Sequence, residues 1–253
     1  MEVFGEHPVF RFVTATRKGF GDGTLPLVKC LNKMTAFVRP NNCCDIDYKI
    51  AYNNSDGLPI VYNKAISDAL NDGVEYLILL HDDIWVNDVL IFDKLLNSAK
   101  FYDVIGVCGG KAWSFNRDDR PIIWTHASQG KGMSGFMAHA ADEAQSSMKY
   151  EHTYDGRSIF SSNYGNSPSK TLTLDGCFMC LTKKAMDSGL RFDEQFKFHF
   201  YDMDLCFSAY VKGISVGTAP ILLTHESLGM SVAQPEFMDS QRKFLDKWFE
   251  KKK

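Results

Sequence analysis

A short, wholly apolar run constrains the fold of this chain most. Residues Tyr76–Leu80 read YLILL, and the run ends abruptly in His81, Asp82 and Asp83. An uninterrupted apolar run of this length suits a strand buried on both faces, as in the centre of a parallel sheet. Two adjacent carboxylates at the end of such a strand are costly to keep charged unless a partner compensates them. A divalent cation is the simplest partner, and a solvated strand end or a helix cap is the alternative.

Strand and helix patterns alternate around this run. The expected strands are Phe10–Thr16, Asp45–Asn53 and Val104–Cys108, and the expected helices are Leu25–Val38, Pro59–Leu70 and Val89–Ala99. Such alternation is typical of an α/β fold with parallel core strands. Ligands bind outside the carboxyl ends of the strands in these sheets. Thr14–Arg17, Asn53–Asn54 and His81–Asp83 all fall at such ends.

The second half of the chain is less regular. Residues 109–170 show no clear period, are rich in Gly, Ser, His and Met, and include Trp113 and Trp124. A long structureless stretch in a compact domain is usually functional or mobile, so we expect an acceptor loop or a lid here. Thr171–Thr182 predicts a strand interrupted by Asp-Gly, and Glu236–Phe249 predicts a closing amphipathic helix. No repeat or low-complexity linker divides the chain, and a single domain is expected.

Composition excludes several classes of protein. The formal net charge of -3 gives no broad electrostatic case for binding nucleic acid. No apolar run reaches the roughly 18 residues that a transmembrane helix needs, and the N-terminus lacks the pattern of a signal peptide. We therefore expect a cytoplasmic protein. Cys177 and Cys180 form a lone CxxC in an apolar run, which favours core packing over a zinc site.

A second acidic cluster and a late histidine follow. Asp202 and Asp204 precede apolar residues with helical spacing, so they are expected at the start of a helix. The helix dipole favours negative charge there, and stabilising a helix start without any further role is the alternative. His225 follows the apolar run Pro220–Leu223. Combined with the earlier carboxylates, it would give a mixed oxygen and imidazole shell, which suits Mn²⁺ better than Mg²⁺.

The ordered set of motifs resembles a known family. The segments are NNSDGLPIVYNKAISDAL, YLILLHDDIWVND and FDEQFKFHFYDMDLCFSAYVKGISVGTAPILLTHESLGM. Together they are similar to the family 2 glycosyltransferases of the GT-A fold, and to the glycosyltransferase-like family that includes a streptomycin-biosynthesis-associated domain. The resemblance spans Phe10–Trp248. It implies an α/β, GT-A fold with a Rossmann-like, mostly parallel central sheet flanked by helices. Residues 1–110 would form a nucleotide-binding half, and residues 111–253 an acceptor-binding half, of a single domain over 1–253.

The resemblance also implies a reaction. Such an enzyme moves a sugar from a UDP-, GDP- or dTDP-linked donor to a hydroxyl of a glycan or another acceptor, with inversion at the anomeric carbon. It implies a divalent metal, Mn²⁺ or Mg²⁺, which Asp83 and His225 would hold. Asp202 would be the general base, and Asp204 competes for that role.

The remaining site residues are also carried over from the resemblance. Expected at the donor are Thr14, Thr16, Arg17, Asn54, His81 and Asp82; expected at the acceptor are Trp113, Asp175 and Tyr201. His81 stands where the family has the first aspartate of its metal motif, and Tyr201 stands where it has an acidic residue. Asn63 matches a recurrent asparagine whose role can be structural alone.

Two other functions remain open from the sequence. A nucleotidyltransferase would also use a metal and aspartates on an α/β sheet, and GFGDG at 19–23, preceded by Arg17 and Lys18, is a faint candidate for its phosphate loop. A non-catalytic carbohydrate-binding pseudo-enzyme could stack sugars on Trp113 and Trp124. Metal-dependent turnover of a nucleotide sugar separates both from a glycosyltransferase.

Overall fold

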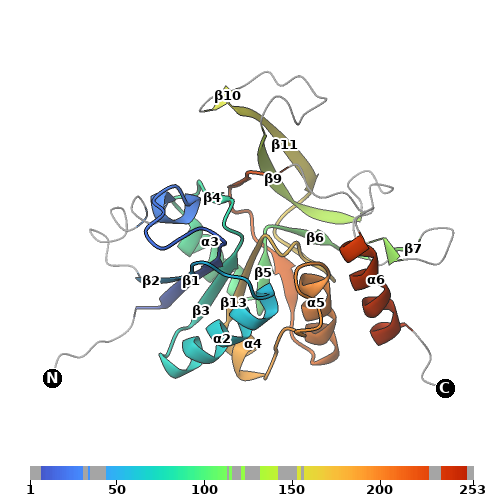
Figure 1. Cartoon of the computed structure of the whole chain (residues 1–253). Coiled ribbons are helices and arrows are strands. Elements are labelled where there is room, and N and C mark those ends of the chain that lie inside the picture. Colours follow the sequence, from blue (N-terminus) through green and yellow to red (C-terminus); the bar gives the residue numbers. More distant parts are fainter. Residues whose placement is uncertain are drawn as a thin grey trace.

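A seven-stranded sheet forms the centre of the molecule, with helices on both faces and a smaller sheet above the carboxyl ends of its central strands (Figure 1). The computed structural model describes residues 7–30, 34, 44–112, 114–115, 121–122, 132–141, 153–154, 157–227 and 235–249. The strands of the large sheet are, in spatial order, β12 (Ser169–Lys170), β14 (Val216–Thr218), β5 (Val104–Gly106), β13 (Phe178–Thr182), β3 (Tyr76–Leu80), β1 (Val9–Ala15) and β2 (Asp45–Ala51).

Most strands of this sheet run in one direction. β1 pairs in parallel with β2 and β3, and β5 pairs in parallel with β14. β13 runs against both β3 and β5, and β12 runs against β14. Five of the seven strands therefore point the same way. This confirms the predicted α/β fold with a mostly parallel central sheet flanked by helices.

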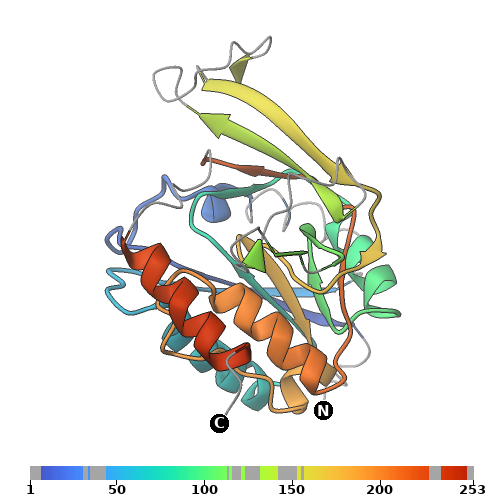
Figure 2. The ribbon, with the colours of Figure 1, turned by 90° about the vertical axis from the view of Figure 1, so that its right-hand side faces the viewer.

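The apolar strand β3 divides the core into two layers. Leu77 and Leu79 contact one buried cluster, and Ile78 and Leu80 contact the other, as the two-residue period of a strand requires. The first layer is covered by α2 (Leu58–Asn71), α4 (Lys183–Asp187), α5 (Tyr201–Val211) and α6 (Pro235–Trp248). The second layer is covered by α3 (Ile91–Ala99) and by helical residues 26–30. Figure 2 shows α5 in orange and α6 in red lying side by side.

The smaller sheet corrects one expectation. Its strands are β10 (Thr153–Tyr154), β11 (Arg157–Gly165), β9 (Met133–Ala141), β15 (Leu223–His225) and β4 (Ile84–Val86), with β6 (Cys108–Gly110) also paired to β9. A structureless loop was expected over 109–170, so that prediction is wrong for the strands described there. Small and polar residues make up most of β9 and β11, so no clear apolar alternation marks them, and pairing with distant strands supplies their order.

Other predicted boundaries shift. The strand expected over Val104–Cys108 divides at Val107, where the chain passes from the large sheet to the small one. Of Thr171–Thr182 only β13 is a strand. Two short strands, β7 (Ser114–Phe115) and β8 (Pro121–Ile122), pair with each other. The predicted helix Leu25–Val38 lies only partly within the described residues.

Two further predictions concern the core and the membrane. Cys177 and Cys180 are both fully buried among apolar residues, which confirms core packing for the CxxC. Among the helices of the described ranges, none has both the length and the apolar character needed to cross a bilayer.

Candidate active site

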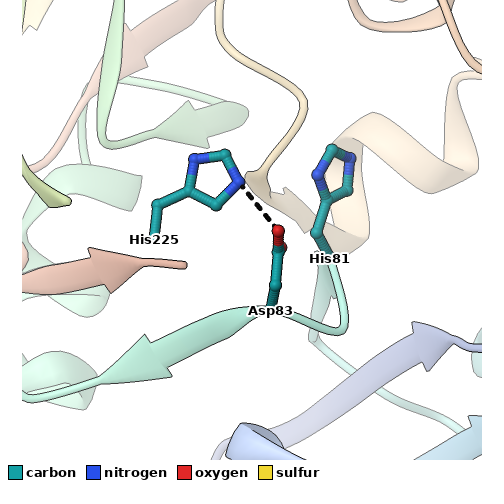
Figure 3. Close-up of side chains that lie close together, drawn as sticks. All are labelled: His81, Asp83 and His225. Atoms are coloured by element: carbon teal, nitrogen blue, oxygen red, sulfur yellow. Dashed lines mark ion pairs between the residues drawn. The ribbon is translucent and has the colours of Figure 1, made fainter. Parts of the chain in front are cut away.

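His81, Asp83 and His225 meet at the carboxyl end of β3 (Figure 3). One potential ligand atom from each residue lies within 4.8 Å of the others. β15 brings His225 next to Asp83, because His225 pairs with Ile84, the residue directly after Asp83. The backbone N–H of Glu226 donates to the carbonyl oxygen of Asp83 at 2.9 Å and fixes the turn. Residues 142 positions apart in the sequence therefore form one cluster.

The electrostatics of this cluster suit a cation. Nε2 of His225 lies 3.3 Å from Oδ2 of Asp83. Burial raises the pKa of Asp83, but the hydrogen bond and charge of His225 outweigh burial and lower it. Burial lowers the pKa of His225, but Asp83 outweighs burial and raises it. Oδ1 of Asp83 is buried without a hydrogen-bond partner. An orphaned carboxylate oxygen beside two imidazoles fits a divalent metal ion.

His81 joins the cluster from the opposite side. Its Nε2 lies 2.8 Å from the hydroxyl of Tyr201, which in turn donates to the carbonyl oxygen of Gly176 at 2.8 Å. Its ring stacks on Phe198, with centroids 5.5 Å apart. Burial lowers the pKa of His81, which favours a neutral imidazole able to ligate a metal.

Asp202 lies in the first turn of α5, close to Asp175. Its Oδ2 accepts from the backbone N–H of Gly176 at 2.9 Å, and its Oδ1 accepts from that of Met203 at 2.8 Å. Burial and the negative charge of Asp175 raise the pKa of Asp202 to about 7. The carboxyl of Asp175 accepts from the backbone N–H of Cys177. A carboxyl with a pKa near neutrality can both take and release a proton in a reaction.

Asp204 faces away from this site. It is 0% exposed, forms an ion pair with Lys247 at 2.8 Å and accepts from Nε1 of Trp248 at 2.7 Å. Two residues along an α-helix correspond to a rotation of about 200°, so Asp202 and Asp204 point in different directions. The geometry therefore favours Asp202 over Asp204 as the candidate base.

A cleft of about 980 Å³ opens beside the cluster. Its lining residues are Ala15, Thr16, Arg17, Lys18, Asn54, Ser55, Asp56, Gly57, Leu58, Asp82, Gln195, Lys197, Phe198, His199, Glu236, Asp239, Ser240 and Lys243. Asp82 connects the cleft to the cluster, since it lies between His81 and Asp83 in the chain. It accepts a 2.6 Å hydrogen bond from the hydroxyl of Thr16. Four of the six predicted donor residues thus line one cleft: Thr16, Arg17, Asn54 and Asp82.

Other predicted residues lie elsewhere. Thr14 is fully buried in β1, and its hydroxyl is not part of the cleft. Tyr201 is 2% exposed, and its hydroxyl makes hydrogen bonds to His81 and Gly176 inside the protein. This burial does not fit the acceptor contact expected of Tyr201. Asp175 is half-buried beside Asp202. Trp113, which was also expected at the acceptor, lies outside the described residues.

Sequence reasoning missed the far wall of the cleft. Lys197, Phe198 and His199 belong to the loop before α5, and Lys243 belongs to α6. An available signal was Phe198, an aromatic residue in the alternating segment FKFHF; its ring is 44% exposed. The position of α6 against the cleft had no local signal, because its polar face reads as an ordinary solvated surface.

Asn63 has the structural role that was considered for it. Its amide accepts from the backbone N–H of Phe192 and donates to the carbonyl oxygen of the same residue, both at 2.9 Å. The two bonds anchor the segment that leads to the loop before α5 and so to the far wall of the cleft.

Comparisons with known proteins give distant similarities only. No protein-family model matches the chain, and no curated protein matches its sequence. One similar solved structure is the catalytic domain of Drosophila beta1,4-galactosyltransferase 7 in complex with xylobiose, with 10% identity over 93% of this chain and 79% of that one, at a TM-score of 0.46. A glycosyltransferase involved in the glycosylation of the major capsid of PBCV-1 is 12% identical over 92% of both chains, at a TM-score of 0.33.

A third similar structure is that of a synthase. The 4-diphosphocytidyl-2C-methyl-D-erythritol synthase of Anaerococcus prevotii is 10% identical over 95% of this chain and 99% of that one, at a TM-score of 0.40. Each of these TM-scores lies below 0.5, so these similarities do not assign a function to this chain.

Proposed function

We propose that this protein is a metal-dependent transferase that moves a sugar from a nucleotide-diphosphate sugar to a hydroxyl of an acceptor. The observation that carries the proposal is the cluster of His81, Asp83 and His225 beside a cleft at the carboxyl ends of the central strands. This is the edge at which α/β sheets bind their ligands. The resemblance to the glycosyltransferases of the GT-A fold supports the choice of sugar transfer.

The cluster supports a metal with an affinity for nitrogen. Two imidazoles and one carboxylate leave open positions on the metal, and such a set suits Mn²⁺ better than Mg²⁺, which prefers oxygen ligands. The buried, unpaired Oδ1 of Asp83 is the atom that most needs a cation. When bound, the metal would neutralise the charge that develops on the leaving nucleoside diphosphate.

The cleft supports an anionic donor. Arg17, Lys18, Lys197 and Lys243 line it from opposite walls and can pair with phosphate oxygens. Asp82, held by Thr16, can accept a hydrogen bond from a ribose hydroxyl. We therefore assign the donor to this cleft. The division into a nucleotide-binding half at 1–110 and an acceptor-binding half at 111–253 then needs a change, because residues of the second half also line the cleft.

Asp202 and Asp175 support proton transfer from the acceptor. The hydroxyl of a sugar is too weakly acidic to attack unaided, and a positioned carboxylate accelerates such a step by roughly 10²–10⁴-fold. Asp202 is held by two backbone N–H groups and has a pKa of about 7, so it is poised to take the proton. One base acting opposite the leaving group corresponds to inversion at the anomeric carbon.

The test is a screen of UDP-, GDP- and dTDP-sugars for release of nucleoside diphosphate, with Mn²⁺, with Mg²⁺ and with EDTA. We expect turnover with one donor class, more with Mn²⁺ than with Mg²⁺, and none with EDTA. Asp83→Asn should weaken binding of metal and donor together in calorimetry. Asp187→Asn is the matched control, because Asp187 pairs with Lys183 on the surface of α4.

The outcomes separate the alternatives. Full turnover in EDTA would remove the metal from the mechanism. Pyrophosphate release from a nucleoside triphosphate and a sugar phosphate would identify a nucleotidyltransferase. Binding of sugar without any release of nucleotide would identify a non-catalytic carbohydrate-binding protein.

A further inference from the structure

The backbone of a single residue, Gly176, connects the metal cluster to the proposed base. The carbonyl oxygen of Gly176 accepts from the hydroxyl of Tyr201, and the N–H of the same residue donates to Oδ2 of Asp202. The hydroxyl of Tyr201 also contacts Nε2 of His81 at 2.8 Å. β13 makes this possible, since it pairs with β3 and its ladder extends to His81, whose N–H donates to the carbonyl of Cys177.

The hydrogen bonds of Tyr201 indicate the tautomer of His81. Tyr201 has one hydroxyl proton, and its hydrogen bond to the buried carbonyl oxygen of Gly176, which can only accept, uses that proton. The hydroxyl is then an acceptor toward His81, and Nε2 of His81 must carry a proton. In a neutral imidazole the other nitrogen, Nδ1, then holds a free lone pair.

We infer that Tyr201 is a positioning residue, which holds His81 in the Nε2-protonated tautomer so that Nδ1 serves as the third protein ligand of the metal. Figure 3 agrees, because it shows the Nδ1 edge of His81 on the side of Asp83 and His225. The inference rests on the proposed metal site and deepens it. It also gives Tyr201 a role that its burial permits, in place of contact with the acceptor.

Gly176 and the start of α5 make the arrangement rigid. A Cβ atom on Gly176 would lie 2.2 Å from the hydroxyl of Tyr201, so only glycine allows this close approach. Phe200, directly before Tyr201, has a φ of 67°, which is unfavourable for a bulky residue. Backbone strain of this kind persists only where the surroundings fix it. Here it directs Tyr201 and Asp202 together toward Gly176.

Metal-ligating histidines commonly donate their second N–H to a fixed acceptor, and loss of that acceptor typically lowers metal affinity by about 10–100-fold. Tyr201→Phe removes the hydroxyl and keeps the ring in the core. We expect it to bind Mn²⁺ about 10–100-fold more weakly by calorimetry. Tyr76→Phe is the matched control, because Tyr76 lies at the opposite end of β3 from His81 and should leave the affinity unchanged.

Nitrogen-15 NMR of the metal-free protein measures the tautomer directly. We expect wild-type His81 to be protonated at Nε2, and Tyr201→Phe to show a mixture of both tautomers. Protonation at Nδ1 in the wild type would overturn the inference, even if Tyr201→Phe failed to fold. Wild-type Mn²⁺ affinity in a folded Tyr201→Phe would overturn it too, while loss of binding in His225→Ala would show that the metal site itself stands. No Mn²⁺ binding by the wild type would instead count against the proposed function.

Discussion

Asp204→Asn and Asp202→Asn should affect different properties of the protein. The first should lower its stability, and the second should lower its turnover. Asp204 is buried against α6, where Lys247 donates to it and Trp248 Nε1 donates to it at 2.7 Å. Asp204→Asn keeps the size of the side chain and the bond from Trp248, but it loses the ion pair. A hydrogen bond to a charged group contributes roughly 1.5–3 kcal/mol.

The surroundings of Asp204 indicate a loss of unfolding free energy in the lower part of that range. Lys247 keeps a second partner, Asp193 at 2.7 Å, and its side chain is 30% exposed. Burial raises the pKa of Asp204 although Lys247 and Trp248 lower it, so the ionised carboxylate is only partly compensated. The neutral amide of asparagine does not have this cost of burying a charge. We expect Asp204→Asn to destabilise the fold by about 2 kcal/mol, or roughly 4–8 °C in Tm for a chain of this size.

The assay combines thermal unfolding with nucleotide release measured well below Tm. Asp204→Asn should lose stability and keep near-normal turnover. Lys247→Met should destabilise as well, and the double variant should cost less than the sum of the two, because the residues share one interaction. A folded Asp204→Asn protein with wild-type Tm and a large loss of turnover would refute the reasoning and would put the base on α5 two residues later.

The remaining predictions concern Asp202 and two structural positions. Turnover should rise with pH through about 7, because a carboxylate base works only when ionised, and burial together with the charge of Asp175 raises the pKa of Asp202 to about 7. In Asp202→Asn, the profile of kcat/KM against pH should lose this rise. The value of kcat/KM should fall by roughly 10²-fold or more. Gly176→Ala should destabilise by about 1–3 kcal/mol in thermal unfolding, since its Cβ clashes with the Tyr201 hydroxyl; an unchanged Tm would contradict that packing. Asn63→Ala should cost about 1–3 kcal/mol by the same measurement, because it leaves the backbone of Phe192 without both partners.

The parts of the fold that the sequence predicts well are those with a strong local pattern. The run Tyr76–Leu80 is apolar at every position after the first and is buried on both faces. Its end points to the candidate site, because polar residues that follow a buried strand lie at the edge of the sheet where ligands bind. The helix after Asp202 also follows from local spacing. Local pattern is enough for these features because each depends on neighbours in the chain.

The parts that escape prediction depend on distant partners. β9 and β11 consist largely of small and polar residues, and they pair with each other and with β15. Asp202 bonds to Gly176 and Asp204 bonds to Lys247, and these partners lie 26 and 43 positions away in the chain. A spacing of one residue between two carboxylates predicts a helix start. It does not say which carboxylate faces the sheet and which faces another helix.

The C-terminal helix α6 explains how one turn of α5 can carry two carboxylates with different roles. Its apolar side packs on α5, where Phe244 contacts both Phe207 and the strained Phe200. Its polar side lines the cleft, where Lys243 can meet an anionic donor. Because packing by α6 helps to hold Phe200 in its unfavourable conformation, the direction of Asp202 depends on a helix that also forms a wall of the cleft. The ion pair of the buried Asp204 with Lys247 therefore fixes α6 at the one place where a shift would disturb both the proposed base and the proposed donor site.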